Sequence, residues 1–126
     1  MSMTQEQKDL LFKDLCARLP YSVKVRYSSY EKFITCTLHA INPVYHNVDL
    51  WSKNGCFNPV DISKIKPYLF PLSSMTEEQE KEWRYTLSSD GNITYDTVDW
   101  CNENHFDYRG LIPMGLAIDC TNLNIY

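Results

Sequence analysis

The stretch YSVKVRYSSYEKFITCTLHAI, residues 21–41, contains two runs in which apolar and polar side chains alternate. Such alternation is typical of strands that bury one face, because successive side chains point to opposite sides of a sheet. Ser28 and Ser29 lie between the runs and favour a turn. The apolar side of the two strands is expected to consist of Tyr21, Val23, Val25, Tyr27, Ile34, Cys36, Leu38 and Ala40.

A third alternating run, YHNVDLW at residues 45–51, follows a break at Asn42 and Pro43. Consecutive strands with short links favour an antiparallel meander. The sequence therefore predicts three antiparallel strands with one apolar and one polar face. In the third strand the expected apolar side is His46, Val48 and Leu50, and the polar side is Tyr45, Asn47, Asp49 and Trp51.

A helix at the start of the chain is expected to cover the apolar face of this meander. Thr4 and Gln7 have the spacing of a capping box, which marks a helix start. Apolar residues then recur at helical spacing until Pro20 stops the run. We therefore predict a helix from Gln5 to about Leu19.

The middle of the chain predicts a loop and then an extended segment. Residues 52–59, SKNGCFNP, are rich in turn formers and are interpreted as a loop. Residues 60–75 contain two prolines, which exclude a regular helix. This segment is expected to run extended and to pack through Ile62, Ile65, Leu69 and Leu72.

Two shorter helices and a strand are expected in the last part of the chain. A second capping box, Thr76 with Gln79, predicts a helix over residues 77–87. A third helix is predicted to start at Asp96, and the apolar run 111–118 is predicted to be a strand. The helices are expected to pack through Trp83, Leu87, Val98 and Cys101. The predicted fold is α+β, with residues 1–126 as a single domain.

Composition narrows the class of protein. The net charge is −4 and no basic run occurs, so binding to DNA or RNA duplexes, which needs clustered cations, is not expected. Five cysteines at wide spacings indicate reduced thiols rather than disulfides or a zinc site. No signal peptide and no stretch of about 20 apolar residues is visible. A cytoplasmic protein with no membrane contact is therefore expected.

The polar face of the meander is the first candidate site. The simpler interpretation is a solvated sheet face with threonines chosen for strand propensity. The alternative is a face that binds an anionic, flat ligand such as a nucleotide. In that case Lys24 and Arg26 would bind phosphate, Trp51 would stack on the base, and Asp49 would accept hydrogen bonds from ribose hydroxyls. The face is expected to hold Lys24, Arg26, Thr35, Thr37, His39, Asn47, Asp49 and Trp51.

The segment NHFDYRG, residues 104–110, is the second candidate site. One interpretation is structural: His105 in the last turn of the third helix, Asp107 paired with Arg109, and Gly110 breaking the helix. The other is that Tyr108 and Arg109 project from a rigid loop and bind phosphate and a ring. Both interpretations stay open at this point.

Catalytic and metal-binding patterns are not found in the sequence. No nucleophile elbow, zinc-protease helix motif or glycine-rich phosphate loop occurs. His39 and His46 are expected on opposite faces of the sheet, and so they would not share a metal ion. Ser73 and Ser74 precede a helix, where serines more often cap than bind an anion. A non-enzymatic protein without cofactors is therefore expected.

Three segments, KPYLFPLSSMTEEQ, LCARLPYSVKV and NHFDYRGLIPMGLAIDCTNLNIY, resemble a family of small proteins from phages and prophages of gut bacteria of the Bacteroides type. The family carries no established activity. The resemblance implies a phage accessory protein that works in the host bacterial cytoplasm.

Together these observations favour a protein that sequesters a phosphorylated small molecule, such as a nucleotide immune signal, as a homo-oligomer. The expected ligand-binding residues are Lys24, Arg26, Asp49, Trp51, Tyr108 and Arg109. Two alternatives stay open: a module that masks a host protein, with Trp83, Trp100 and tyrosines as hot spots, and a small hydrolase of nucleotide signals.

Overall fold

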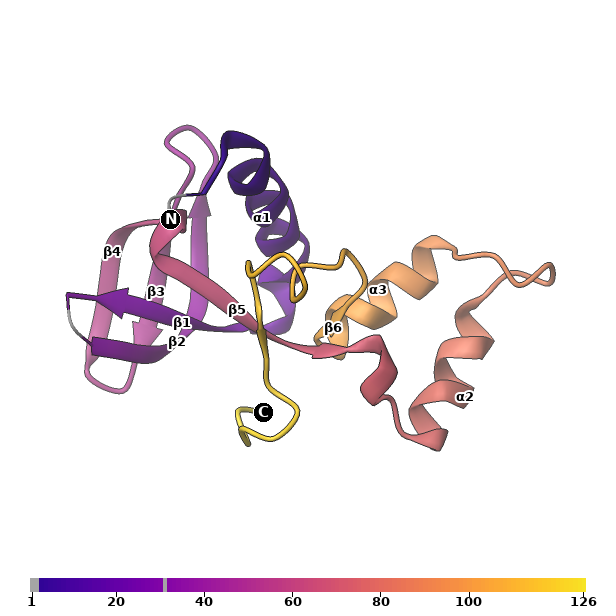
Figure 1. The fold of residues 1–126 in the computed structure, drawn as a ribbon. Coiled ribbons are helices and arrows are strands. Elements are labelled where there is room, and N and C mark those ends of the chain that lie inside the picture. The colour runs from indigo at the N-terminus through magenta and orange to yellow at the C-terminus, as the bar shows by residue number, and fades with distance from the viewer. Residues whose placement is uncertain (1–2, 31) are drawn as a thin grey trace.

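The computed structural model describes residues 3–30 and 32–126 and shows an α+β fold. A curved sheet with strand order β4-β3-β2-β1-β5-β6 lies against the N-terminal helix α1, and β7 pairs with β5. Two further helices, α2 and α3, project from the far end of β5 (Figure 1). The sheet is therefore larger than the predicted three-stranded meander.

Helix α1 spans Gln5–Arg18, as predicted. Thr4 and Gln7 form the predicted capping box, in which each side chain receives a hydrogen bond from the other residue's backbone N–H. A short 3₁₀ helix, Leu19–Tyr21, follows and contains Pro20. Leu11 and Leu15 are completely buried against the sheet, so α1 covers the apolar face.

The three predicted strands form the antiparallel meander. They are β1 (Lys24–Ser29), β2 (Lys32–Asn42) and β3 (Asn47–Ser52). One detail of the predicted alternation is wrong, because a bulge at His39 shifts the register between Leu38 and Ala40. The extra residue sends Ile41 toward the core, where it packs, and pairs Ala40 with Asp49 instead.

A fourth strand, β4 (Gly55–Asp61), occupies the segment that was interpreted as a loop. The turn formers make only a tight connection at Lys53 and Asn54, and Gly55 then takes a φ of 126° that favours glycine. The rest of the segment pairs with β3. Its apolar side chains contribute to the core, because Val60 is buried and the Phe57 ring lies 5.0 Å from that of Tyr27.

The segment predicted to be extended is strand β5 (Ile65–Pro71), preceded by a 3₁₀ turn at Ile62–Lys64. Its first half pairs antiparallel with β1, and its second half pairs parallel with two short strands. Three of the four expected anchors are buried: Ile62, Ile65 and Leu69. The fourth, Leu72, is 41% exposed, because the chain leaves the sheet in a 3₁₀ turn at Leu72–Ser74.

The predicted C-terminal strand over residues 111–118 is mostly wrong. In this part of the chain two short strands, β6 (Phe106–Asp107) and β7 (Ile118–Asp119), pair with β5, and of residues 111–118 only Ile118 belongs to a strand. Pro113 and Gly115, which has a φ of 77°, interrupt the run. Leu111, Leu116 and Ala117 are still buried, so the apolar character reflects an irregular buried segment and not a ladder.

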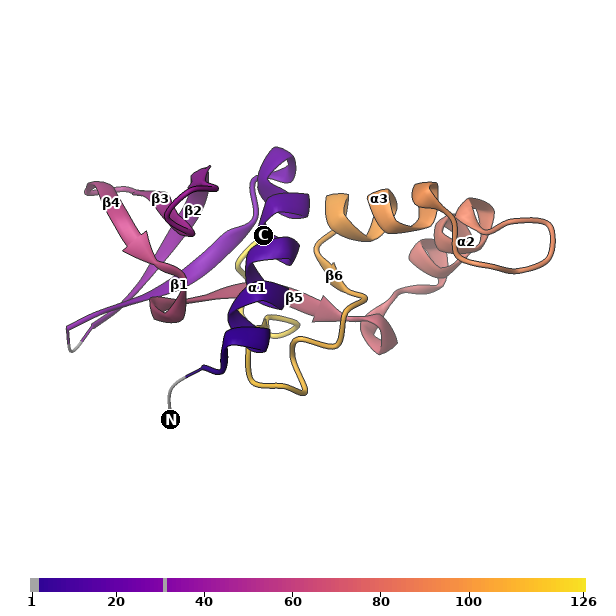
Figure 2. The same ribbon diagram turned by 90° about the horizontal axis from the view of Figure 1, so that it is seen from above.

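Helices α2 (Glu77–Thr86) and α3 (Tyr95–Glu103) form what we call the arm, residues 72–104. Figure 1 and Figure 2 both show the arm projecting away from the sheet. Thr76 and Gln79 form the second predicted capping box. The arm is thinly packed, since α2 contributes no fully buried side chain while α3 buries Thr97, Cys101 and Asn102.

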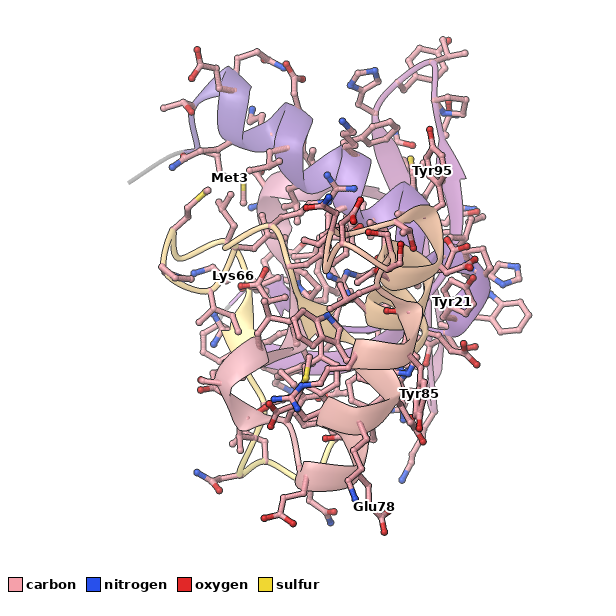
Figure 3. The ribbon with its side chains drawn as sticks, turned by 90° about the vertical axis from the view of Figure 1, so that its right-hand side faces the viewer. Met3, Tyr21, Lys66, Glu78, Tyr85 and Tyr95 are labelled. Atoms are coloured by element: carbon pink, nitrogen blue, oxygen red, sulfur yellow. The ribbon has the colours of Figure 1, made fainter. Side chains whose placement is uncertain are left out.

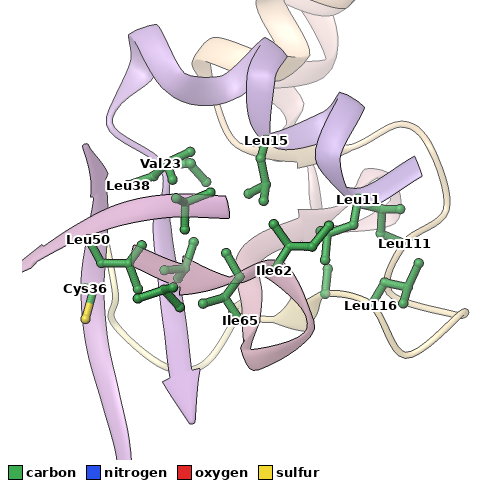
Figure 4. Close-up of a cluster of buried hydrophobic side chains, with 14 of the residues drawn as sticks. Leu11, Leu15, Val23, Cys36, Leu38, Leu50, Ile62, Ile65, Leu111 and Leu116 are labelled. Atoms are coloured by element: carbon green, nitrogen blue, oxygen red, sulfur yellow. The ribbon is translucent and has the colours of Figure 1, made fainter. Parts of the chain in front are cut away.

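The core lies between α1 and the concave side of the sheet (Figure 4). Its apolar side chains come from the helix, five strands and the segment after β6, so distant parts of the sequence share one core. The other side of the sheet, which we call the outer face, carries the alternate, mostly polar side chains. The buried cluster consists of Leu11, Leu15, Val23, Val25, Cys36, Leu38, Val48, Leu50, Val60, Ile62, Ile65, Leu69, Leu111, Leu116 and Ala117.

Candidate functional site

A groove of about 700 Å³ runs across the outer face. Its floor is a row of residues that face each other across three strands. Lys24 on β1 pairs with Thr37 on β2, and Thr37 pairs with Trp51 on β3. Directly opposed residues lie on the same face of a sheet, so a cation, a hydroxyl and an indole ring line the floor in that order.

One side of the Trp51 ring is covered by a neighbouring ring, and the other side is exposed to solvent. Its ring stacks on that of His39, with centroids 3.6 Å apart and planes 17° from parallel. The bulge at His39 places this imidazole against the indole. Trp51 is nonetheless 53% exposed. A fixed, exposed aromatic ring can stack on a flat ligand at a low cost in conformational entropy.

The end of the chain forms one wall of the groove through Asn124 and Ile125. Tyr126 fixes this wall: its hydroxyl accepts a hydrogen bond from the Lys24 backbone N–H at 2.8 Å and donates one to the Tyr68 carbonyl at 3.0 Å. The Tyr126 ring stacks on His105 at 3.8 Å. Burial raises the pKa of the Tyr126 hydroxyl, so it stays protonated at neutral pH.

The charge of the groove is positive. Among the described residues that line it, Lys24 and Lys53 are the charged ones, and no carboxylate is present. Lys53 comes from the turn between β3 and β4. Two ammonium groups beside hydroxyl and amide side chains suit a phosphorylated or otherwise anionic ligand. The other lining residues are Ile34, Thr35, Cys36, Ser52 and Asn54.

Arg26 lies on the same face but does not line the groove. It faces Thr35 on one neighbouring strand and Lys66 on the other. Its guanidinium lies 4.1 Å from the centre of the Phe33 ring, which occupies it in a cation–π contact. Arg26 is therefore placed closer to the β1–β2 turn than the predicted site required.

Asp49 is separated from the groove by the same bulge that moves Ala40. It lines a second, shallow hollow with Asn47, Asn58 and Pro59. The prediction that Asp49 joins Trp51 and Lys24 in one site therefore has no support from the lining of the groove.

Tyr108 and Arg109 lie on the α1 side of the molecule, away from the outer face. Arg109 Nε donates to Asp14 Oδ1 at 3.2 Å, and Arg109 Nη2 donates to the Tyr108 hydroxyl at 3.0 Å. Asp14 also holds Arg18, whose Nη2 donates to the Phe106 carbonyl at 2.7 Å. The Tyr108 ring lies beside both guanidinium groups, 5.3 Å from that of Arg18 and 4.9 Å from that of Arg109. These contacts join α1 to the segment after α3.

The expected pair between Asp107 and Arg109 is not formed. Asp107 instead accepts hydrogen bonds from the backbone N–H groups of Leu111 and Ile112, both at 2.9 Å. It therefore holds the turn around Gly110, which has a φ of 76°. The structural interpretation of this segment is favoured, with different partners from those expected.

His105 lies beyond the end of α3 and not in its last turn, with a φ of 63°. Burial, with a smaller contribution from the positive charge of Arg18, lowers the pKa of its imidazole to about 4. Its Nδ1 is buried without a hydrogen-bond partner in the described structure. The ring is therefore neutral at physiological pH and contributes packing.

The remaining candidates are structural in their contacts. His39 stacks on Trp51, and His46 stacks on Phe12 of α1, so the two histidines lie on opposite sides of the sheet as expected. The cap of α2 is Thr76, while the Ser74 hydroxyl donates to the Pro71 carbonyl. Within residues 3–30 and 32–126, no three His, Cys, Asp or Glu side chains gather closely enough to hold a metal ion.

Sequence reasoning brought together four of the groove residues: Lys24, Thr35, Thr37 and Trp51. It missed Lys53 and Asn54, because their segment was interpreted as a loop and not as a hairpin turn. It also missed Asn124 and Ile125. The aromatic residue Tyr126 was the one signal in the sequence that this segment packs against the sheet.

Comparison with models of protein families, with curated proteins and with solved structures finds no match to this chain. In the described part of the chain, no helix is long and apolar enough to cross a bilayer.

Proposed function

We propose that the protein is a non-catalytic binding protein that sequesters a small phosphorylated ligand with a flat ring, and that the outer-face groove is the binding site. The observation that carries the proposal is the cross-strand row of Lys24, Thr37 and Trp51. It places a cation for a phosphate and a ring for a base on the same floor.

The ligand would lie with its ring on Trp51 and its phosphates toward Lys24 and Lys53. Lysines bind phosphate as point charges, and the hydroxyls and amides of Thr37, Ser52 and Asn54 would satisfy its remaining polar atoms. Asp49, Tyr108 and Arg109 are left out of this site, and Arg26 lies outside its lining.

The resemblance to phage proteins suggests which phosphorylated ligands to try first. A phage protein gains from removing a nucleotide immune signal, such as a cyclic dinucleotide or a cyclic ADP-ribose derivative, and removal by binding needs no chemistry. The same context would put this activity in the bacterial cytoplasm.

The test is a thermal melting assay of the purified chain with a panel of cyclic dinucleotides, ADP-ribose derivatives and mononucleotides. A ligand present at about 100 times its Kd should stabilise the folded state by about 2.7 kcal/mol. Trp51→Ala and Lys53→Gln should abolish or weaken the shift. Lys13→Gln is the matched control, because Lys13 is exposed on α1. A panel that gives no shift at all would remove the proposal.

Recovery of the bound ligand separates sequestration from hydrolysis. The complex is denatured and the ligand is analysed by mass spectrometry. Unchanged ligand supports sequestration, whereas a cleaved product would show that the protein is a hydrolase of nucleotide signals.

A further inference from the structure

The arm and the β1–β2 end of the sheet, where β1 ends at Ser29 and β2 begins at Lys32, lie at opposite ends of the molecule in both ribbon views (Figure 1, Figure 2). The two ends differ in charge. Residues 72–104 contain eight acidic residues and two basic ones in the sequence. Residues 26–33 at the other end contain two basic residues and one acidic one in the sequence, and the basic ones are Arg26 on β1 and the exposed Lys32 at the start of β2.

The arm contains an apolar groove of about 310 Å³ between the Leu72–Ser74 turn and α2. Leu72, Met75 and Trp83 form its apolar lining, and Glu80 supplies a carboxylate. A smaller hollow of about 90 Å³ continues from it toward α3 and shares Leu72 and Trp83. Trp83 of α2 lines both hollows, and no side chain of α2 is completely buried.

The arm also carries exposed apolar side chains, of which Ile93 lines the smaller hollow. Tyr85 and Tyr95 are 89% and 91% exposed, and Ile93 is exposed as well. Figure 3 looks onto this end of the molecule and labels Tyr85 and Tyr95 there, together with Glu78. An exposed apolar patch with a polar rim is typical of a protein contact surface. Trp100 is not part of it, because its ring stacks on Phe106 and its Nε1 donates to Glu82.

The other end of the molecule offers matching chemistry. Phe33 is 68% exposed, the guanidinium of Arg26 lies over its ring, and Tyr30 at the turn is fully exposed. Ring side chains among cations are what an acidic apolar groove would accept, since the ring fills the hollow and the cations meet the carboxylates at its rim.

We propose that the arm groove binds the β1–β2 end of a second copy of this chain. The contact is heterologous, because two different surfaces meet, and copies therefore join head to tail into a closed ring or an open chain. A strand end seated in a groove of about 310 Å³ should give a small contact, at the low end of specific interfaces and below about 1,200 Å² of buried surface. Assembly should therefore depend on concentration and weaken as salt screens the charges.

The experiment uses sedimentation velocity on the full chain over a range of concentrations at low and high salt. Two variants each damage one surface: Phe33→Ser at the β1–β2 end, and Leu72→Lys in the arm groove. Both side chains are exposed, so the fold should be kept, and circular dichroism checks this. Val44→Ser is the matched control, because Val44 is an exposed apolar residue that belongs to neither surface.

The native chain and Val44→Ser are expected to form larger species as concentration rises, and each damaged variant alone is expected to be monomeric. A mixture of the two damaged variants is the decisive measurement. Each still carries the intact surface that the other lacks, so the mixture should give dimers and nothing larger.

Three results would overturn the proposal. The first is a native chain that stays monomeric at every concentration and salt, which would leave the arm to a separate basic protein. The second is self-association that neither Phe33→Ser nor Leu72→Lys weakens. The third is a mixture that stays monomeric although each variant is folded, since a symmetric interface would behave in that way. None of these results depends on whether the outer-face groove binds a nucleotide.

Discussion

Arg18 and Asp14 form an ion pair on α1 whose side chains are both completely buried, with Nε and Oδ2 2.8 Å apart. The two residues are one helical turn apart and face the segment after α3. There Arg18 donates a hydrogen bond to the Phe106 carbonyl, and Asp14 pairs with Arg109. It therefore fixes how α1 meets a part of the chain almost ninety positions away, as the 88-residue separation of the Arg18–Phe106 hydrogen bond records.

Asp14→Asn should destabilise the protein by about 3–5 kcal/mol, because it leaves the charge of Arg18 buried without compensation. The loss is expected to be much smaller for Arg109→Gln, since the Arg109 side chain is 19% exposed and reaches water. Urea unfolding measures both. A double variant, Asp14→Leu with Arg18→Met, should lose less stability than the sum of the losses measured for Asp14→Leu alone and Arg18→Met alone. Additive losses would contradict the interpretation of a coupled buried pair.

Asp107→Asn should lower the free energy of unfolding by about 2 kcal/mol. The substitution places an amide NH₂ group where one carboxylate oxygen accepts a backbone N–H, and a buried donor is left without an acceptor. Asp119→Asn is the control, because the Asp119 carboxylate also accepts a backbone N–H but is exposed. Equal losses in the two variants would show that Asp107 has no special role in the turn.

Stability should fall as the pH is lowered from 6.5 toward 4. The imidazole of His105 has a pKa of about 4 in the folded state against an ordinary value of 6.5. Between these pH values the unfolded state binds more protons, so acid favours unfolding, and the full contribution is present only above pH 6.5. The loss is expected to be on the order of 2 kcal/mol after allowing for the partial exposure of the ring.

His105→Asn tests whether this dependence belongs to His105, because asparagine tolerates the left-handed backbone but does not titrate. The measurement is the slope of the free energy of unfolding against pH. The variant should have a flatter slope in this range, whatever its stability at pH 7. An unchanged slope would assign the dependence to other groups.

Thiol labelling should separate the cysteines into two classes. Cys16 and Cys56 are exposed, while Cys36, Cys101 and Cys120 are buried, and all five are free. Burial raises the pKa of both Cys101 and Cys120 to about 11, which further lowers their reactivity. A thiol reagent under native conditions should therefore modify Cys16 and Cys56 quickly and the other three only after unfolding. Fast labelling of Cys101 would indicate that the arm opens readily.

Local sequence signals predicted the elements whose cause is local. The capping boxes at Thr4 and Thr76 place the starts of α1 and α2, and strict alternation places β1, β2 and β3. Strand β4 was missed because its residues look like turn formers, although only Lys53 and Asn54 form the turn. The bulge at His39 was missed because nothing in the alternation marks an extra residue.

The candidate site depended on long-range contacts and was predicted only in part. Alternation alone put Lys24 and Trp51 on one face, and the register confirms this. Arg109 could not be placed, because its partner Asp14 is on a helix 95 positions earlier in the chain. In the sequence, a charged loop residue that forms an ion pair inside the protein looks the same as one that binds a ligand.

The sparse packing of α2 has a consequence for how the sequence of this protein can evolve. A helix that contributes no fully buried side chain can accept substitutions at its exposed positions with little effect on the sheet and α1. Selection acting on what the arm meets can therefore alter that surface rapidly, while the body of the protein stays constant.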